Sequence, residues 1–181
     1  MAAPSTIDIL DISGRWHLNP TLSSPSEAFL TLQGAPWLLR RIIGLVTLDF
    51  EYTKLPQAPG SRSPRFHQKT IIRPGGFGSE NSFNIDGVAW TEPTPLFGDI
   101  RVRCHYANSD EVARDYGLPG LDIADPNNAA IIESVESKAK GWTATSVWAF
   151  EVIDGVRRYV KYNTAKKGDK VEKIRMVTIM K

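Results

Sequence analysis

The sequence predicts an all-β protein, a single up-and-down antiparallel β-barrel of about ten strands with a short helical hairpin after the first strand. Gly14-Arg15-Trp16 lies near the N-terminus, where the glycine lets a first strand bend and the indole closes one end of a barrel. One helical segment follows, and from Leu45 onward turn residues alternate with period-2 strands. A small barrel of this kind encloses one apolar molecule, so the sequence also predicts the class of ligand.

The composition indicates one compact domain over residues 1–181, because 181 residues with 41% hydrophobic content form one core. The net charge of +2 is too small to indicate a nucleic-acid partner. Cys104 is the single cysteine, which excludes an intramolecular disulfide and favours a reducing compartment. The first seven residues do not have the pattern of a secretory signal, and no apolar run is long enough for a membrane span. We expect a cytoplasmic monomer or homodimer.

The helical hairpin is predicted over residues 24–44. Ser24-Pro25-Ser26-Glu27 has the form of a capping box with Ser24 as N-cap, and Gly34 ends this first helix. Pro36 opens a second helix, which Gly44 closes. Arg40 and Arg41 beside Trp37 suit weak contact with an anionic membrane, although the sequence favours an ordinary solvated helix face.

The strands after the hairpin are predicted from alternating hydrophobicity between turn signals. Their predicted bounds are Leu45–Thr53, Arg65–Arg73, Ser79–Ile85, Val88–Thr91, Gly98–Tyr106, Ala129–Lys138, Trp142–Ile153, Val156–Asn163 and Lys170–Met180. Asp86-Gly87 and Asp154-Gly155 each predict a tight hairpin. Pro56–Pro64 predicts a loop, and Pro74–Gly78 predicts a turn or bulge rather than a nucleotide-binding loop. Residues 107–128 form a long connection, which is typical of either a lid or a poorly ordered segment.

These features resemble the lipocalin and fatty-acid-binding protein superfamily. Gly14-x-Trp16 followed by a helix–turn–helix carries the general resemblance, and Phe29–Gly34 through Arg40-Arg41 to Gly44 is similar to the helical portal of intracellular fatty-acid-binding proteins. Lys140–Glu151 with Ile153–Tyr159 is similar to small fungal lipocalin-like proteins that are encoded beside secondary-metabolite enzymes. The resemblance implies a ligand-binding barrel. A relative from phenalenone biosynthesis is a cyclase that adds a phenol oxygen across a prenyl alkene, which implies a cyclase activity.

The chain departs from the fatty-acid-binding pattern at its end. Those proteins hold a carboxylate with an Arg-x-Tyr pair, whereas Arg175-Met176-Val177 keeps the arginine and loses the phenol. This argues against a fatty-acid carboxylate site and leaves a bulkier, less acidic ligand open. Arginines at the last strand of such barrels commonly lie over the first-strand tryptophan, so the resemblance implies a cation–π contact between Arg175 and Trp16.

Two strands carry most of the candidate site residues. On Gly98–Tyr106, the sequence leaves open whether the apolar face with Tyr106 or the charged face with Arg103 and His105 points inward. On the strand beginning at Trp142, the even positions suit either a wall for a flat ligand or ordinary core filling. These even positions include Trp142, Ser146, Trp148 and Phe150. On the odd face of the same strand, Glu151 is either a proton-transfer group or an ion-pair partner of Arg157 or Arg158.

Two functions follow from these residues. The first is a cofactor-independent cyclase or isomerase that folds an apolar prenylated aromatic, polyketide or terpenoid intermediate and moves a proton. Its predicted catalytic residues are Glu151, Arg103, His105 and Tyr159; its predicted ligand-binding residues are Trp16, Trp37, Tyr106, Trp142, Ser146, Trp148, Phe150 and Arg175. No metal-binding or cofactor-binding pattern is present in the sequence, so none is expected. The second function is a non-catalytic carrier of a hydrophobic small molecule, and a structural partner of another enzyme is a third.

Overall fold

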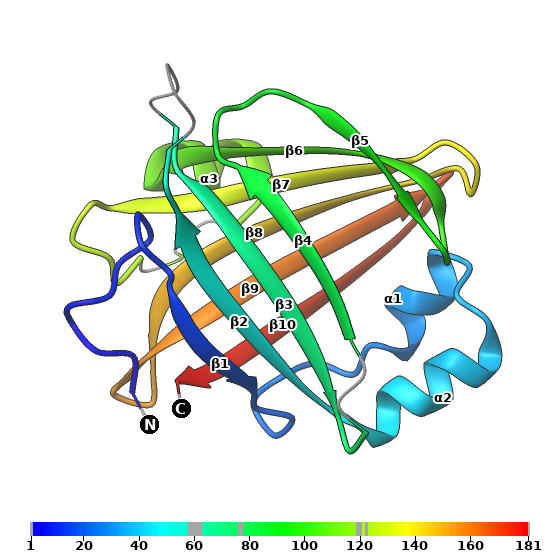
Figure 1. Ribbon diagram of the computed structural model, residues 1–181, viewed down its shortest axis with the longest axis horizontal. Helices are drawn as coiled ribbons and strands as arrows, with labels where there is room; N and C mark the ends of the chain where they lie inside the picture. Colours follow the sequence, from blue (N-terminus) through cyan, green and yellow to red (C-terminus); the bar gives the residue numbers. More distant parts are fainter. Residues whose placement is uncertain (1, 58–62, 76–77, 119–120, 122, 181) are drawn as a thin grey trace.

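A computed structural model describes residues 2–57, 63–75, 78–118, 121 and 123–180. Within this part of the chain, ten antiparallel strands form one sheet in the order β4-β3-β2-β1-β10-β9-β8-β7-β6-β5, and the sheet curls on itself (Figure 1). The elements are β1 (Gly14–Leu18), α1 (Glu27–Leu32), α2 (Trp37–Leu45), β2 (Thr47–Leu55), β3 (Arg65–Arg73), β4 (Gly78–Asn84), β5 (Trp90–Thr94), β6 (Gly98–Asn108), α3 (Ser109–Tyr116), β7 (Ala129–Ser137), β8 (Trp142–Ile153), β9 (Val156–Lys167) and β10 (Lys170–Met180). The predicted all-β class with a helical hairpin after the first strand is confirmed.

The curled sheet has its two edges at β4 and β5, and this differs from the prediction. The Asp86-Gly87 turn was expected to pair these strands, yet β5 pairs only with β6 among the described strands. The turn bonds to β6 instead: the Gly87 N–H donates to the Cys104 carbonyl at 2.8 Å, and Arg103 Nε donates to the Gly87 carbonyl at 2.8 Å. The backbone around Gly87 is therefore held by β6 and does not bring β4 and β5 together. Parts of the predicted Pro56–Pro64 loop and Pro74–Gly78 turn lie outside the described residues.

The helices α1 and α2 lie together at one end of the barrel (Figure 1). The predicted cap at Ser24 is wrong, because its hydroxyl accepts the Arg175 N–H at 3.0 Å, which ties the segment to β10. The first helix consequently begins at Glu27. Phe29 and Leu32 of α1 pack with Trp142 inside the barrel end, while no residue of α2 is buried. None of the helices in the described ranges is long and apolar enough to cross a bilayer.

The connection over residues 107–128 contains the helix α3, which was not predicted. Asn108 and Glu111 form a reciprocal capping box at its start, and Gly117 ends it in the left-handed conformation with a φ of 64°. Val112 of α3 packs with Ile132 and Val147 on the outer face of the sheet. This helix therefore covers the outside of β7 and β8, at the opposite end from α1 and α2 (Figure 1).

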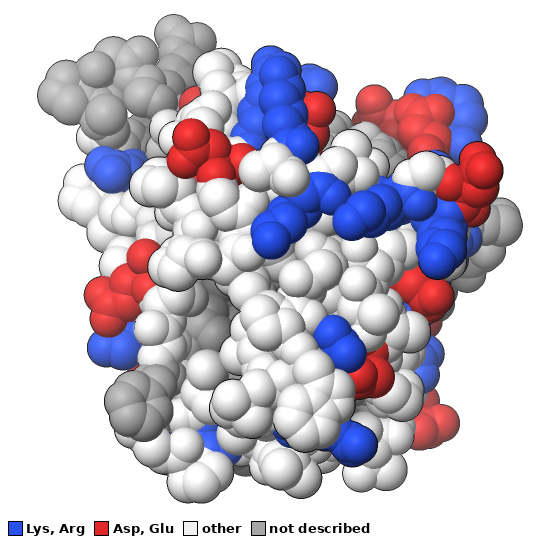
Figure 2. Space-filling view, turned by 90° about the vertical axis from the view of Figure 1, so that its right-hand side faces the viewer, with Lys and Arg blue, Asp and Glu red and all other residues white. Residues whose placement is uncertain are grey.

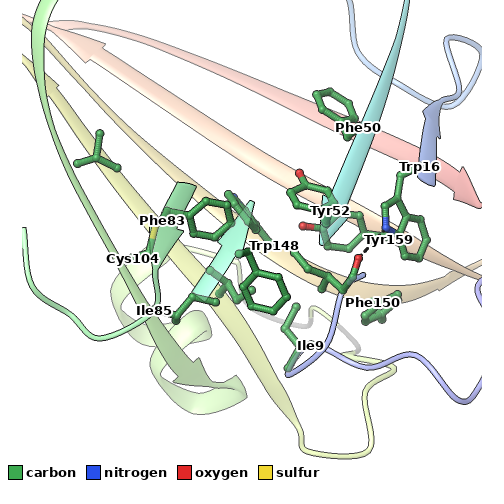
Figure 3. Close-up of a cluster of buried hydrophobic side chains, with 14 of the residues drawn as sticks. Ile9, Trp16, Phe50, Tyr52, Phe83, Ile85, Cys104, Trp148, Phe150 and Tyr159 are labelled. Carbon is green, nitrogen blue, oxygen red and sulfur yellow. Dashed lines mark hydrogen bonds between the residues drawn. The ribbon is translucent and has the colours of Figure 1, made fainter. Parts of the chain in front are cut away.

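One end of the barrel interior is filled by a cluster of large side chains (Figure 3). Trp16 is fully buried, its ring centroid lies 5.0 Å from that of Tyr159 and 5.9 Å from that of Phe150, and its indole N–H donates to the Ile12 carbonyl at 3.0 Å. Tyr52, Phe66, Phe83 and Trp148 extend the cluster across the barrel. We call this set of residues the aromatic core.

Arg157, not Arg175, closes the barrel beneath the aromatic core. Its guanidinium lies 3.8 Å from the Phe150 ring centroid, and it donates to the carbonyls of Ala124, Pro4 and Ile7. These contacts hold the N-terminal segment and the residues before β7 against the base. The base of the barrel is thus fastened by one half-buried cation and three carbonyls.

The predicted cation–π contact between Arg175 and Trp16 is wrong, and the register explains why. Trp16 pairs with Met180 across β1 and β10, and both side chains point inward. Arg175 is five positions away from Met180, an odd number, so its side chain lies on the outer face. There it donates to the Leu22 carbonyl at 3.4 Å.

We predict that Trp16→Ala lowers the free energy of unfolding by about 3–5 kcal/mol, because it leaves a cavity in the aromatic core and removes a buried hydrogen bond. Urea unfolding followed by circular dichroism measures the change. The matched control is Trp37→Ala on α2, where the indole is 61% exposed, and the change expected there is within about 0.5 kcal/mol. Equal losses at both positions would contradict the assignment of Trp16 to the core.

Candidate functional site

Polar side chains form a band across the inner face of the sheet, just beyond the aromatic core. Cys104, Glu133, Ser146 and Asn163 are directly opposite one another across the neighbouring strands β6, β7, β8 and β9. They point inward because they share their strand faces with core residues such as Ile131 and Trp148. A polar group inside a barrel costs free energy unless it is bonded or serves a ligand, so this band is the candidate functional site.

Lys161 of β9 lies beside this band and is 9% exposed. Its Nζ sits 3.5 Å from the Trp148 ring centroid, 5.5 Å from that of Tyr52 and 5.6 Å from that of Phe50. Among the described residues, no carboxylate lies within 4 Å of this Nζ and no hydrogen-bond acceptor contacts it. The ammonium group therefore has aromatic rings as its direct contacts.

Glu133 brings a carboxyl group into the same interior. Its burial raises the pKa of the carboxyl above its usual range, and the positive charge of Lys161 opposes this rise. The neighbouring Ser146 hydroxyl donates to Asn163 Oδ1 at 2.7 Å. Burial also raises the pKa of the Tyr159 phenol well above its usual value, with the Tyr52 hydroxyl adding to the rise. The site thus contains one cation and two groups that hold a proton beyond their ordinary range.

Between the aromatic core and the helix α1, several inward-pointing side chains are only half-buried. These residues are Leu48, Gln68, Thr70, Ile72, Asn81, Glu92, Glu133, Val135, Ile174 and Met176. We call the part of the barrel interior that these side chains border the chamber. Its floor is the face of the aromatic core that carries Lys161, and its upper wall is apolar around Ile174 and Met176.

The structure places seven of the sequence-predicted site residues on the inner face. These are Trp16, Tyr106, Trp142, Ser146, Trp148, Phe150 and Tyr159. Ser146 and Trp148 adjoin Glu133 and Lys161 directly, whereas Trp16 and Phe150 lie deeper in the aromatic core. For β6, the structure resolves the open choice in favour of the apolar face, since Ile100, Val102 and Cys104 belong to the core.

Four further predicted residues lie on the outer face. Arg103 and Arg175 bond to backbone carbonyls there. His105 Nε2 contacts the Tyr116 hydroxyl at 3.3 Å, and burial together with Arg103 lowers the pKa of its imidazole. Glu151 accepts the Tyr162 O–H at 2.6 Å. These groups do not reach the chamber.

The expected ion pair between Glu151 and an arginine of β9 does not form within the described part of the chain. Glu151 stands opposite Arg158 in the register but bonds to Tyr162. Arg157 points to the inner face, where its Nη2 lies 3.7 Å from Asp125. Trp37, the remaining predicted ligand-binding residue, is on α2 with its indole exposed.

Sequence reasoning missed Glu133, Lys161 and Asn163. Each is a polar residue at an inward position of a strand, and alternation alone assigns such residues to the solvent face. Residues two apart on a strand share a face, and this spacing could have revealed them. Glu133 lies two residues from both Ile131 and Val135, and Lys161 lies two residues after Tyr159. A polar residue in phase with an apolar face predicts an interior polar group.

No protein-family model matches the chain. The chain is 26% identical to the probable pericyclase scpY of Mollisia scopiformis over 177 residues, which is 97% of this chain and 93% of that protein. It is also 26% identical to the pericyclase pydY of Acremonium sp over 181 residues, covering 98% of this chain and 95% of that protein.

Among solved structures, the fatty acid binding protein of Schistosoma mansoni in complex with arachidonic acid matches with a TM-score of 0.55 and 17% identity. The match covers 93% of this chain and 96% of that chain. These comparisons confirm the expected family resemblance. The chain has the fatty-acid-binding-protein-like fold and is similar over nearly its whole length to fungal pericyclases.

We predict that Glu133→Gln stabilises the protein more at pH 8 than at pH 5. A carboxyl with a raised pKa keeps its proton in the folded state when the unfolded chain has released it, so the stability of the parent protein falls as the pH rises. The variant removes this titration. Each unit by which the pKa of Glu133 is raised lowers the free energy of unfolding of the parent protein at high pH by about 1.4 kcal/mol. For each kcal/mol, the melting temperatures of the parent and the variant should differ by about 2–4 °C.

Thermal unfolding at the two pH values measures this difference. Glu136→Gln is the matched control. Glu136 lies on the same strand, three residues after Glu133, and therefore on the outward face. A melting-temperature difference between Glu133→Gln and the parent that is the same at both pH values would contradict the interior assignment.

Proposed function

We propose that the protein is a cofactor-independent cyclase or isomerase that holds an apolar natural-product intermediate in the chamber and directs its ring closure. The observation that carries this proposal is an ammonium group and a carboxyl group, those of Lys161 and Glu133, on the inner face of neighbouring strands beside an aromatic wall. Similarity to fungal pericyclases supports a cyclase-type activity. We also infer that residues 1–181 form one domain and that it acts in the cytoplasm.

The chamber would first select a conformer of the substrate. Trp148, Tyr52 and Phe50 present flat surfaces around the Lys161 ammonium, and Met176 and Ile174 line the wall beside Lys161 on β10. A prenylated aromatic, polyketide or terpenoid chain pressed between such surfaces loses its extended conformers. Holding reacting atoms in one geometry supplies several kcal/mol of the barrier without a cofactor.

The polar groups would then act on the charge that develops during ring closure. Lys161 stabilises negative charge on a carbonyl or phenol oxygen of the substrate. Glu133 in its protonated form donates a proton, and its carboxylate takes one back, so product and substrate have the same composition. Of the sequence-predicted catalytic residues, Tyr159 remains in this proposal as a buried phenol near the floor, whereas Arg103, His105 and Glu151 face outward and do not.

A carrier function is the second candidate, and the exposed surface of α2 favours it. Trp37 and Leu38 are 61% and 63% exposed, and Leu45 is 86% exposed. The solvent-facing lysines of the adjacent turns are Lys138, Lys140, Lys167 and Lys170. Figure 2 views this end of the molecule, where blue basic side chains border a broad white surface. An apolar patch bordered by cations suits docking to an anionic membrane from which a ligand is collected.

The cyclase proposal predicts turnover of a linear precursor. Incubation with prenylated phenols or polyene carbonyl compounds should give a product of unchanged mass and fixed chirality, detected by chiral chromatography with mass spectrometry. Glu133→Gln and Lys161→Met should each lower the rate by about 10²-fold or more, as for loss of a positioned acid–base or charge-stabilising group. Glu136→Gln should retain the parent rate. Binding of these compounds without turnover would favour the carrier.

The carrier proposal predicts binding to vesicles. Flotation with phosphatidylcholine vesicles containing phosphatidylglycerol should recover the protein, and recovery should fall at high salt because exposed charges are screened. Trp37→Ser combined with Leu45→Ser should weaken binding about tenfold or more through lost apolar burial. Val152→Ser is the control, since Val152 is 48% exposed but lies near the β8–β9 turn. Loss of binding in this control, or none in the double variant, would contradict docking through α2.

A further inference from the structure

We infer that Lys161 is the anion subsite of the chamber and that the natural ligand is an apolar molecule with one anionic oxygen group, such as an enolate, a phenolate or a carboxylate. This deepens the proposed function by naming the ligand class. It requires only that the chamber binds a ligand, so it holds for the cyclase and for the carrier.

The first argument is the unbalanced charge of Lys161. Transfer of an ammonium group from water into a protein interior is costly unless a carboxylate or a set of acceptors compensates it. Lys161 is 9% exposed, and its Nζ has aromatic rings as its nearest partners among the described residues. A cation–π contact returns about 0.5–2 kcal/mol, which leaves part of the cost uncompensated. A ligand anion would supply the missing partner.

The second argument is that the other interior polar groups are already engaged. Ser146 donates to Asn163 Oδ1 at 2.7 Å, and Asn163 Nδ2 donates to the Lys161 carbonyl at 3.2 Å. On β5, Glu92 accepts the Trp90 indole N–H at 3.1 Å. Burial raises the pKa of Glu133, which weakens it as a counter-ion for Lys161. Within the described part of the chain, neither Glu92 nor Glu133 forms an ion pair with Lys161 Nζ, so the ammonium group has no direct anionic contact.

The third argument concerns position. Arg157, the other cation of β9 at an inward position, lies beneath Phe150 and is bonded to three carbonyls. Arg175 of β10 is on the outer face. Lys161 lies where the aromatic floor meets the open part of the chamber, next to Met176 in the register. A ligand oxygen at Lys161 Nζ places the apolar remainder along Met176 and Ile174 toward α1.

A pair of fluorescent probes that differ by one anionic group tests this inference. The probes are 1-anilinonaphthalene-8-sulfonate and its uncharged parent, N-phenyl-1-naphthylamine. We expect the unmodified protein to bind the sulfonate at least about tenfold more tightly. Lys161→Met should weaken binding of the sulfonate about tenfold or more and change binding of the uncharged probe less than about twofold. Lys161→Arg should retain the preference for the anion.

Lys173→Met is the matched control, because Lys173 is exposed on the outer face of β10. Equal affinity of the unmodified protein for the two probes would overturn the inference without any variant. Equal weakening of both probes by Lys161→Met, with its circular dichroism unchanged, would show that Lys161 only shapes the chamber. A loss in Lys173→Met as large as that in Lys161→Met would place the anion on the surface.

Thermal unfolding gives a second measure that does not depend on a probe. Replacement of a buried, unpaired ammonium by a side chain of similar length should raise the melting temperature of Lys161→Met above that of the parent protein. A lower melting temperature would mean that Lys161 is already compensated within the fold, which overturns the inference. Charge-selective binding without any turnover would refute the cyclase while the anion subsite stands.

Discussion

The pairing of β1 with β10 is the constraint on which the rest of the structure depends. It joins the first strand to the last and sets Trp16 opposite Met180, and every other strand takes its inner and outer faces from that register. A shift by one residue would exchange the faces of β10 and bring Arg175 inward. The indole bond from Trp16 to Ile12 and the Arg157 contacts hold this end closed. The position of the candidate site is therefore a consequence of how the ends of the chain meet.

The sequence was sufficient for the fold class and for the strands with strong alternation. Three strands have the predicted bounds, at Arg65–Arg73, Trp142–Ile153 and Lys170–Met180, because turn residues frame an uninterrupted period-2 pattern there. The edges of the sheet were not predictable. Asp86-Gly87 is a good local signal for a hairpin between β4 and β5, but the backbone of Gly87 forms hydrogen bonds with β6 instead. The helix α3 had a readable signal in the capping box of Asn108 and Glu111, which lay within a segment rich in turn residues.

The candidate site was only partly predictable for a related reason. Ser146 and Trp148 were found because a small polar residue among aromatic residues stands out on an apolar face. Lys161 and Glu133 were not found, because local alternation treats a charge as a mark of the solvent face. Placing them inside requires the long-range register of β7, β8 and β9, which no single strand contains. Interior polar groups of such a barrel are therefore the charged or polar residues that occupy inward positions of an otherwise apolar strand face.

The two halves of the interior have complementary physical roles. Burying Lys161 and Glu133 costs stability, and a fold with a hollow interior has fewer contacts with which to offset this cost. The aromatic core compensates by packing the base of the barrel from Trp16 through Trp148. It also ends in a flat surface, so the rings that stabilise the fold are the rings against which a ligand would lie. Because Lys161 Nζ lies against the Trp148 ring, this surface also positions the charge in advance, and such preorganisation is what binding and charge stabilisation both require.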